Sequence, residues 1–206
     1  HHHTYTPDHS NVNDVWQWGF GAINSCNRIL YNIGNSTLAP TDPIRVNAIA
    51  EVKAMRGLFY FYMMDIYGNI PIVDTFPVLD LPHTKQRAEV FSFIEKDLKS
   101  VVDLLPVKNA NNATLTYAHP TKAMVHALLA KMYINSKVYT GVDRNTDAIR
   151  YCDSVITNRN YSLDASYATV FAPDNGPATA ETIFAIPYDP LQLDGQQQVS
   201  SLYPGN

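Results

Sequence analysis

Charged residues are scarce in this chain, and cysteines are scarcer. Only 17% of the 206 residues are charged, the formal net charge is −4, and there are two cysteines, Cys26 and Cys152. A mildly acidic chain lacks the basic face that neutralises phosphates, so no nucleic-acid partner is expected. Both cysteines stand at helix-like positions beside apolar neighbours, which favours two buried free thiols over a disulfide framework.

Apolar runs long enough to cross a bilayer are also missing. The most apolar stretch, GLFYFYMM at 57–64, is less than half of the ~20 residues that a membrane span needs. We therefore expect a helix that other parts of the protein bury on most of its circumference. The chain opens HHHTYTPDHSNVND rather than with a basic and then an apolar segment, so no secretory leader is expected in it. The three opening histidines are either a tag remnant or native, and no metal site is expected there.

Signatures of catalysis are lacking as well. Glycosidase chemistry needs two facing carboxyl groups, but the candidate carboxylates fall on separate predicted elements. These candidates are Glu51, Asp65, Glu89, Asp97 and Glu181. There is no Gly-x-Ser-x-Gly elbow and no glycine-rich phosphate loop. His126 lies among apolar helix positions and is expected to be a packed or surface residue rather than a ligand. Neither an enzyme nor a cofactor is expected.

Aromatic residues, by contrast, are abundant, with 13 Tyr, 8 Phe and 2 Trp. Tyrosine combines a large apolar face with a hydroxyl, so it suits helix–helix cores and also surfaces that bind sugars or peptides. Composition alone does not separate these two uses.

Apolar positions recur at three- and four-residue steps, which predicts long helices. Four are expected, over residues 14–32, 44–66, 88–104 and 122–136. Asn13 is the expected N-cap of the first helix, and Gly34 its C′ residue. Thr41 or Asp42 can cap the second helix, and Gly68 ends it. Glu95 and Lys99 form a predicted i,i+4 pair on the wet side of the third helix.

The second helix carries two apolar stripes, so neighbours are expected on both sides. One stripe comprises Val52, Met55, Phe59, Tyr62 and Ile66; the other comprises Ala50, Ala54, Gly57, Phe61 and Met64. Asn27 lies inside the apolar stripe of the first helix, and a buried amide must find a partner, so we interpret it as a structural hydrogen-bond clamp. The structural core is expected to include Trp16, Phe20, Asn27, Phe59, Tyr62 and Ala127, with Phe59 buried.

The predicted fold class is mainly α: antiparallel helix pairs with long loops and a short extended segment at 181–189. Alternating small and large stripes are typical of stacked tetratricopeptide pairs, although the strict 34-residue consensus is absent. No parallel sheet is expected.

Four blocks in this order resemble the SusD/RagB family of outer-membrane nutrient-binding lipoproteins. They are the frame of Trp16, Phe20, Ile23 and Asn27; AEVKAMRGLFYFYMMDIYGNIPIV; RAEVFSFIEKDL with a Leu-Pro stop; and PTKAMVHALLAKMYI with AIRYCDSVI and ETIFAIPY downstream. The sequence departs from the family pattern at Lys53, usually Arg, and at Gly57, usually Ala.

The resemblance implies a tetratricopeptide-like helical fold and a non-catalytic glycan-binding role. It also implies a place on the surface of the outer membrane, through a lipid anchor upstream of His1, so neither present cysteine is the anchor. The partner would be a TonB-dependent transporter, which receives the captured oligosaccharide. Residues 1–206 would form a single helical domain, the N-terminal part of a longer protein. The alternative is a helical scaffold whose groove docks a partner protein and which has no small ligand of its own.

The ligand is expected on loops and exposed aromatic residues rather than on the helical core. The candidate glycan-binding residues are Tyr5, Trp18, Tyr188, Asp189 and Tyr203, with Asp8 and Asn11 as further polar candidates. Arg56 and Asp65 flank the aromatic run but lie nine positions, or ~13 Å, apart on a helix, so they are not expected to converge on one ligand.

Overall fold

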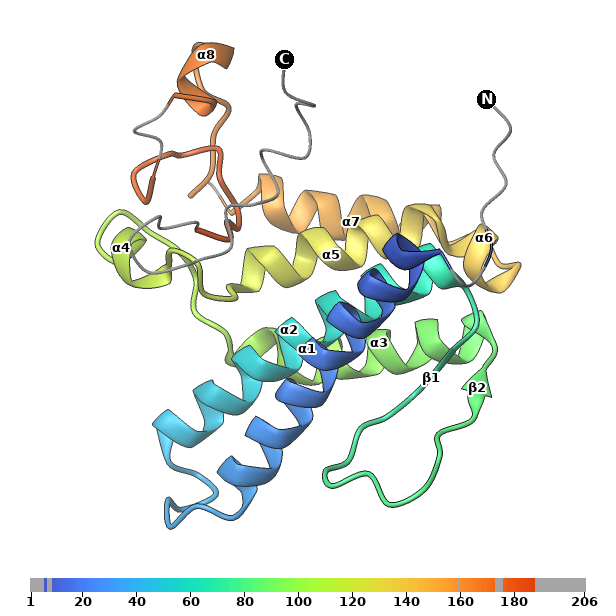
Figure 1. Ribbon diagram of the computed structural model, residues 1–206. Helices are drawn as coiled ribbons and strands as arrows, with labels where there is room; N and C mark the ends of the chain where they lie inside the picture. The colour runs from blue at the N-terminus through green and yellow to red at the C-terminus, as the bar shows by residue number, and fades with distance from the viewer. Residues whose placement is uncertain (1–5, 7–8, 159, 173–175, 188–206) are drawn as a thin grey trace, which may run out of the picture.

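The computed structural model describes residues 6, 9–158, 160–172 and 176–187 (Figure 1). Three elements carry the first half of the fold: α1 (Ser10–Gly34), α2 (Pro43–Tyr67) and α3 (Arg87–Val101). A 3-10 turn, Val102–Leu104, extends α3. The second half contains α4 (Ala113–Thr116), α5 (Lys122–Ile134), α6 (Ser136–Thr140), α7 (Asn145–Ile156) and α8 (Tyr167–Val170).

Neighbouring helices pack as antiparallel pairs. Helix α1 packs on α2, α2 packs on α3, and α5 packs on α7, as Figure 1 shows. The fold is thus mainly helical and tetratricopeptide-like, as the sequence predicts. The two short strands β1 (Ile70–Pro71) and β2 (Thr84–Lys85) pair antiparallel, and they are the sheet that the described residues form.

The helix ends follow local capping chemistry. The Asp42 carboxylate accepts the Ile44 amide hydrogen at 2.8 Å, so it caps α2 as predicted. Gly68 ends α2 with a φ of 78°, a backbone conformation that other residues adopt at a cost. The predicted N-cap at Asn13 is wrong because α1 begins one turn earlier, at Ser10, with His9 in the cap position. Gly34 is the last residue of α1, and Asn35 occupies its C-cap.

Helix α2 is the interior helix that its sequence predicts. Tyr60, Phe61, Met63 and Met64 are buried almost completely. A Cβ added at Gly57 would lie 2.7 Å from Leu98 Cδ2, so glycine at this position lets α3 approach α2 closely. Protein therefore encloses one side of the aromatic run, the side that carries Tyr60, Phe61, Met63 and Met64. Among the described residues, no helix is both long and apolar enough to cross a membrane.

Several core expectations need correction. Phe59 and Tyr62 are only partly buried, because their face of α2 turns toward the surface beside α1. Trp16 and Phe20 likewise pack against the core without being enclosed by it. Ala127 on α5 is also partly exposed. Asn27 is buried, with 2% of its surface exposed.

Two further expectations differ from the structure. Cys26 is buried but Cys152 is exposed, because it lines a hollow between α5 and α7 that is open to solvent. The apolar segment expected to be extended lies outside regular secondary structure over its described part, residues 181–187. A strand needs a neighbouring strand for its backbone hydrogen bonds, and none lies beside this segment in the described chain.

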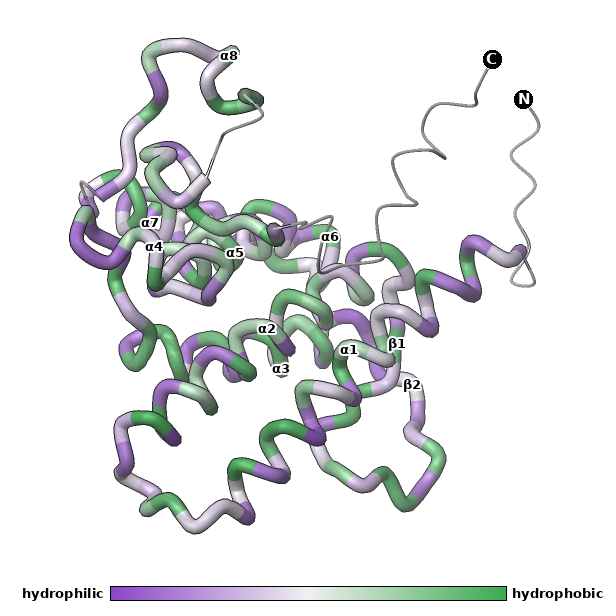
Figure 2. Tube along the Cα trace, turned by 60° about the vertical axis from the view of Figure 1, so that its left-hand side comes forward, coloured by the Kyte–Doolittle hydropathy of each residue, from purple (hydrophilic) through white to green (hydrophobic). Residues whose placement is uncertain are grey.

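The connection between β1 and β2 leaves the helices as a long excursion (Figure 2). Two apolar residues on it, Leu79 and Leu81, are 87% and 91% exposed. Its base is held against α1 and α2 by polar contacts.

Candidate functional site

An exposed aromatic residue stands on the open face of the α1–α2 pair. Trp18 is 55% exposed, and its ring meets the edge of Phe59 at a centroid distance of 5.4 Å. Partly buried Met55 and Tyr62 extend the same face of α2. Phe59 fixes the plane of the indole while leaving most of it open to solvent. A held, exposed indole is what a stacking contact with the C–H face of a sugar ring requires.

The other tryptophan of α1 is placed differently. Trp16 packs on Phe20 at 4.5 Å and edge-on to Tyr67 at 5.0 Å, both measured between ring centroids. The Tyr67 hydroxyl donates to the Val12 carbonyl at 2.5 Å, which ties the end of α2 to the start of α1. Two tryptophans two residues apart thus have separate roles, one in packing and one at the surface.

A buried polar network lies beneath this face. The Arg56 guanidinium donates to the Asp97 carboxylate at 2.6 and 2.9 Å and to Asn27 Oδ1 at 2.8 Å. The Asn27 amide in turn donates to the Val73 carbonyl at 2.8 Å. Asn27 therefore acts as the hydrogen-bond clamp that the sequence predicts, and it joins α1, α2, α3 and the segment after β1.

Tyr60 completes the attachment of that segment. Its hydroxyl donates to the Val73 carbonyl at 2.8 Å and accepts from the Val73 amide at 2.7 Å. Burial raises the pKa of Tyr60 to about 12, so the phenol stays protonated and keeps both bonds. The base of the β1–β2 excursion is therefore fixed by side chains from two helices.

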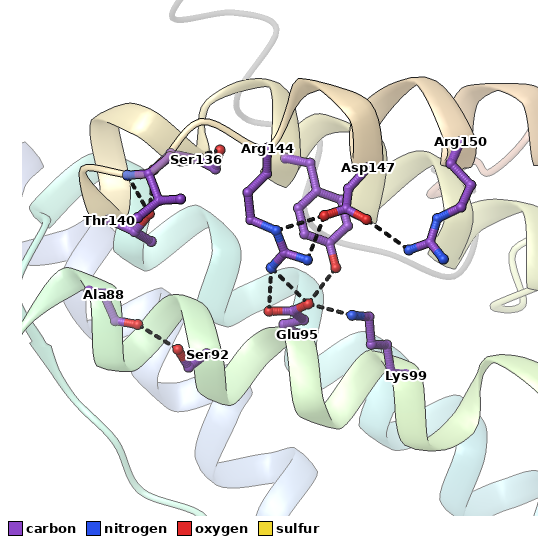
Figure 3. Close-up of polar contacts among 11 residues, drawn as sticks. Ala88, Ser92, Glu95, Lys99, Ser136, Thr140, Arg144, Asp147 and Arg150 are labelled. Carbon is purple, nitrogen blue, oxygen red and sulfur yellow. Dashed lines mark hydrogen bonds and ion pairs between the residues drawn. The ribbon is translucent and has the colours of Figure 1, made fainter.

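A second polar cluster joins α3 to α5 and α7 (Figure 3). Glu95 accepts from Arg144 at 3.0 Å, from the Tyr133 hydroxyl at 2.5 Å and from Lys99. Burial by itself would raise the pKa of Glu95, but these three donors outweigh burial and hold it below the ordinary value. The predicted Glu95–Lys99 pair exists on α3: Lys99 is exposed, as expected, whereas Glu95 is partly buried toward Tyr133 and Arg144.

Each remaining carboxylate considered for catalysis has its own structural partner. Glu51 contacts His119 at 3.0 Å, Asp65 accepts from Tyr139 at 2.6 Å and Glu181 accepts from the Asp164 amide at 2.9 Å. Glu89 closes a capping box at the start of α3. Asp65 and Arg56 thus bind different partners, as the helix geometry predicts, and no two of these carboxylates share a contact in the described part of the chain.

His126 is half-buried beside Tyr151, with ring centroids 5.5 Å apart. Burial lowers its pKa, and its Nδ1 atom has no hydrogen-bond partner. Over residues 9–158 and the other described segments, no group of three potential metal ligands comes together.

Most of the expected glycan contacts lie outside the described residues. These are Tyr5, Asp8, Tyr188, Asp189 and Tyr203. Asn11 lies in the first turn of α1 and is exposed, as is Trp18. Trp18 is therefore the one aromatic candidate that can be placed.

Sequence reasoning missed two groups of contacts. One is the Glu95 cluster with Arg144, whose members are separated by 49 residues in the chain. The other is a polar cavity of about 560 Å³ that Lys108, Thr114 and Tyr161 line. An isolated lysine in a polar, aperiodic stretch gave no local signal for either packing or binding.

Antiparallel helix pairs of this kind define a tetratricopeptide-like helical protein. Trp18 and Phe59 give this protein an aromatic surface. A family model described as "Starch-binding associating with outer membrane" matches residues 1–134. The chain belongs to this SusD-like family. Proteins of the family bind carbohydrate and are not catalysts.

Individual proteins that resemble the chain in sequence and structure are also SusD-like. Over 142 residues the chain is 30% identical to the starch-binding protein SusD of Bacteroides thetaiotaomicron, which is 68% of this chain and 24% of that protein. The structure of a SusD-like protein from Bacteroides fragilis has 25% identity and a TM-score of 0.71, over 85% of this chain and 34% of that one. Surface glycan-binding protein A from B. thetaiotaomicron, solved with laminarihexaose, has 24% identity and a TM-score of 0.67, over 82% and 34%. The chain thus spans about a quarter to a third of the length of these relatives.

Proposed function

We propose that the full-length protein is a non-catalytic glycan-binding protein of the outer-membrane surface. The observation that carries this proposal is Trp18, an indole in a T-shaped contact with Phe59 and 55% open to solvent. Stacking on such a ring is a general way to hold a sugar. Family membership and a relative solved with laminarihexaose support the same ligand class.

The remaining parts of the proposal extend from the family. Residues 1–206 form one helical domain, the N-terminal part of a longer protein. A lipid anchor outside this chain attaches the protein to the outer membrane, and the bound oligosaccharide passes to a TonB-dependent transporter. Tyr5, Tyr188, Asp189 and Tyr203 contribute to the glycan surface together with Trp18.

Calorimetric titration of the full-length protein tests the ligand class. Oligosaccharides from starch, laminarin and xyloglucan are titrated separately into the protein and into its Trp18→Ala variant. Binding of at least one series, weakened in the variant, supports the proposal. Binding of none contradicts the assignment of the glycan surface to Trp18, and release of shortened products during the titration contradicts the non-catalytic role.

A protein-docking scaffold is the second candidate, and one observation favours it. The α5–α7 pair presents an almost wholly apolar hollow of about 380 Å³, lined by Ala130, Ile134, Val155 and Ile156 among others. Ile134 and Ile156 are 65% and 72% exposed. Apolar surface of this kind marks interaction sites on proteins. Co-purification of the full-length protein with its transporter, lost in Ile156→Asp but kept in Trp18→Ala, distinguishes docking from glycan binding.

A further inference from the structure

A polar cavity of about 560 Å³ lies where α4 meets two later segments, 160–162 and 176–180. Figure 1 shows α4 at the same end of the molecule as the orange and red part of the chain. The volume is typical of small-molecule sites. The residues that line it include Lys108, Thr114, Asn160, Tyr161 and Ser162, together with several alanines and Pro177.

Lys108 is the sole charged residue among the described residues that line the cavity. Its ammonium donates to the carbonyls of Thr179 at 3.1 Å and Thr182 at 3.2 Å, and it lies 5.4 Å from the centroid of the Tyr161 ring. No carboxylate of the described chain lies within ion-pair distance of it. An ammonium has three N–H donors, so among the described residues the two carbonyls leave one donor without a partner and the positive charge without a counter-ion.

The partial burial of this ammonium has an electrostatic consequence. Burial lowers the pKa of Lys108, and no opposing charge offsets that effect. A charge that is taken out of water without a counter-ion is unfavourable. An anion that entered the cavity would therefore stabilise the charged form of Lys108.

Neutral hydrogen-bonding groups surround the charge. The hydroxyls of Thr114 and Ser162 line the cavity, and among described residues neither has a hydrogen-bond partner. The Ser162 amide donates to the Ala180 carbonyl at 3.3 Å, which ties together the two segments that form one wall. Asn160 adds an amide whose nitrogen donates to Asn158 at 2.5 Å, so its carbonyl oxygen is left to accept. Hydroxyl and amide groups of this kind match the hydroxyls of a sugar.

We propose that this cavity binds the carboxylate-bearing unit of an acidic oligosaccharide, a uronate, with Lys108 against the carboxylate and Thr114, Asn160 and Ser162 against the hydroxyls. The ligand being a sugar rests on the proposed function. A neutral sugar would leave the ammonium uncompensated. A phosphate dianion would meet one cation only, whereas a monovalent carboxylate matches the single charge.

The test compares two ligands that differ only in charge. Oligogalacturonate and its methyl ester are titrated calorimetrically into the full-length protein. The acid is expected to bind about tenfold or more tightly than the ester, because a charge-assisted hydrogen bond replaces a neutral one. Added salt should weaken binding of the acid and leave the ester unchanged.

Variants assign the preference to the cavity. Lys108→Met should abolish the preference for the acid and Lys108→Arg should keep most of it, while exposed Lys96→Met on α3 is the matched control and should change nothing. Because Lys108 also holds two carbonyls, Thr114→Val and Ser162→Ala provide a second arm. Both should weaken binding of acid and ester alike while leaving the thermal midpoint in place.

Three results overturn the inference: equal affinity for acid and ester, no binding of the acid, or an unchanged preference in Lys108→Met. Titration with neutral glucans separates this outcome from that of the proposed function. Glucan binding that depends on Trp18, without binding of oligogalacturonate, overturns the cavity assignment alone. Oligogalacturonate binding that depends on Lys108, without glucan binding, overturns the Trp18 surface alone.

Discussion

Trp18 and Phe59 meet edge to face at 5.4 Å across the α1–α2 pair, yet 55% of the tryptophan remains exposed. An apolar ring of this size at the surface costs hydration free energy that a ligand could recover. The contact with Phe59 also removes rotamer freedom before any ligand arrives, which reduces the entropy cost of binding.

Trp18→Ala should weaken glycan binding in the full-length protein while shifting its thermal midpoint by less than about 4 °C. The reason is that the exposed ring contributes little to packing. Trp16→Ala is the matched control, because Trp16 packs on Phe20 and Tyr67. It should lower the midpoint clearly. If Trp18→Ala lowers the midpoint as much as Trp16→Ala does, the indole is a packing residue.

Phe61→Ala should cost about 3–5 kcal/mol of unfolding free energy, since it leaves a cavity in the core. Phe59→Ala should cost less, about 2 kcal/mol, because this ring is only partly buried. Urea unfolding followed by circular dichroism measures both. Equal losses would mean that the open face of α2 is covered in solution.

Arg56→Met should lower the free energy of unfolding by about 3–5 kcal/mol, because the buried Asp97 carboxylate loses the cation that pairs with it. Lys53→Met is the control: Lys53 lies 3.8 Å from the same carboxylate, but its side chain is 31% exposed. That pair should be worth less than about 1 kcal/mol. Similar losses in the two variants, measured by denaturant unfolding, would contradict the assignment of Arg56 as the main partner.

Glu95→Gln should destabilise the protein at pH 7 by roughly 1–3 kcal/mol, because three donors stabilise the ionised carboxylate. The pKa of Glu95 lies below its ordinary value of 4.5. A depressed pKa contributes stability that is present above the ordinary value and is lost as the pH falls through the folded-state value. The difference between wild type and Glu95→Gln should therefore be constant above pH 5 and shrink in more acidic buffer. If the stability difference grew as the pH fell, the pKa of Glu95 would be raised in the folded protein rather than lowered.

The helices were predictable because their signals are local. Asp42 marks the start of α2 and Gly68 its end, each through a contact within four residues of the chain. The spacing of the apolar residues predicts the helix between them. Asp97 lies 41 residues from its partner Arg56, and Arg144 lies 49 residues from Glu95. Single-sequence periodicity contains nothing about such distant pairings. Asn27 lies between these two cases. An amide in an apolar stripe predicts that a hydrogen-bond partner exists, but the sequence does not identify that partner.

Phe59 shows where periodicity misleads. Two apolar stripes on one helix indicate two apolar faces, and the prediction of burial assumed that both faces have neighbours within this chain. In the structure Phe59 contacts Trp18 of α1, and Met55, Phe59 and Tyr62 of this stripe are only partly buried. The pattern correctly predicted that this face of α2 is apolar, but it wrongly predicted that the face is buried. The same limit applies to Cys152, whose apolar neighbours line a hollow that is open to solvent.

The guanidinium of Arg56 holds the side chains of Asn27 and Asp97, so it connects three helices at one point. Removing any one of these helices from the others would leave a charge or an amide in apolar surroundings. Partial unfolding of α1, α2 or α3 by itself is therefore unfavourable, and the amides of all three should exchange with deuterium at one shared rate. Segments 160–172 and 176–187, which contain no element longer than α8, should exchange earlier and independently. The protein would thus open in at least two stages, with the Lys108 cavity lost in the first and the Trp18 surface kept until the second.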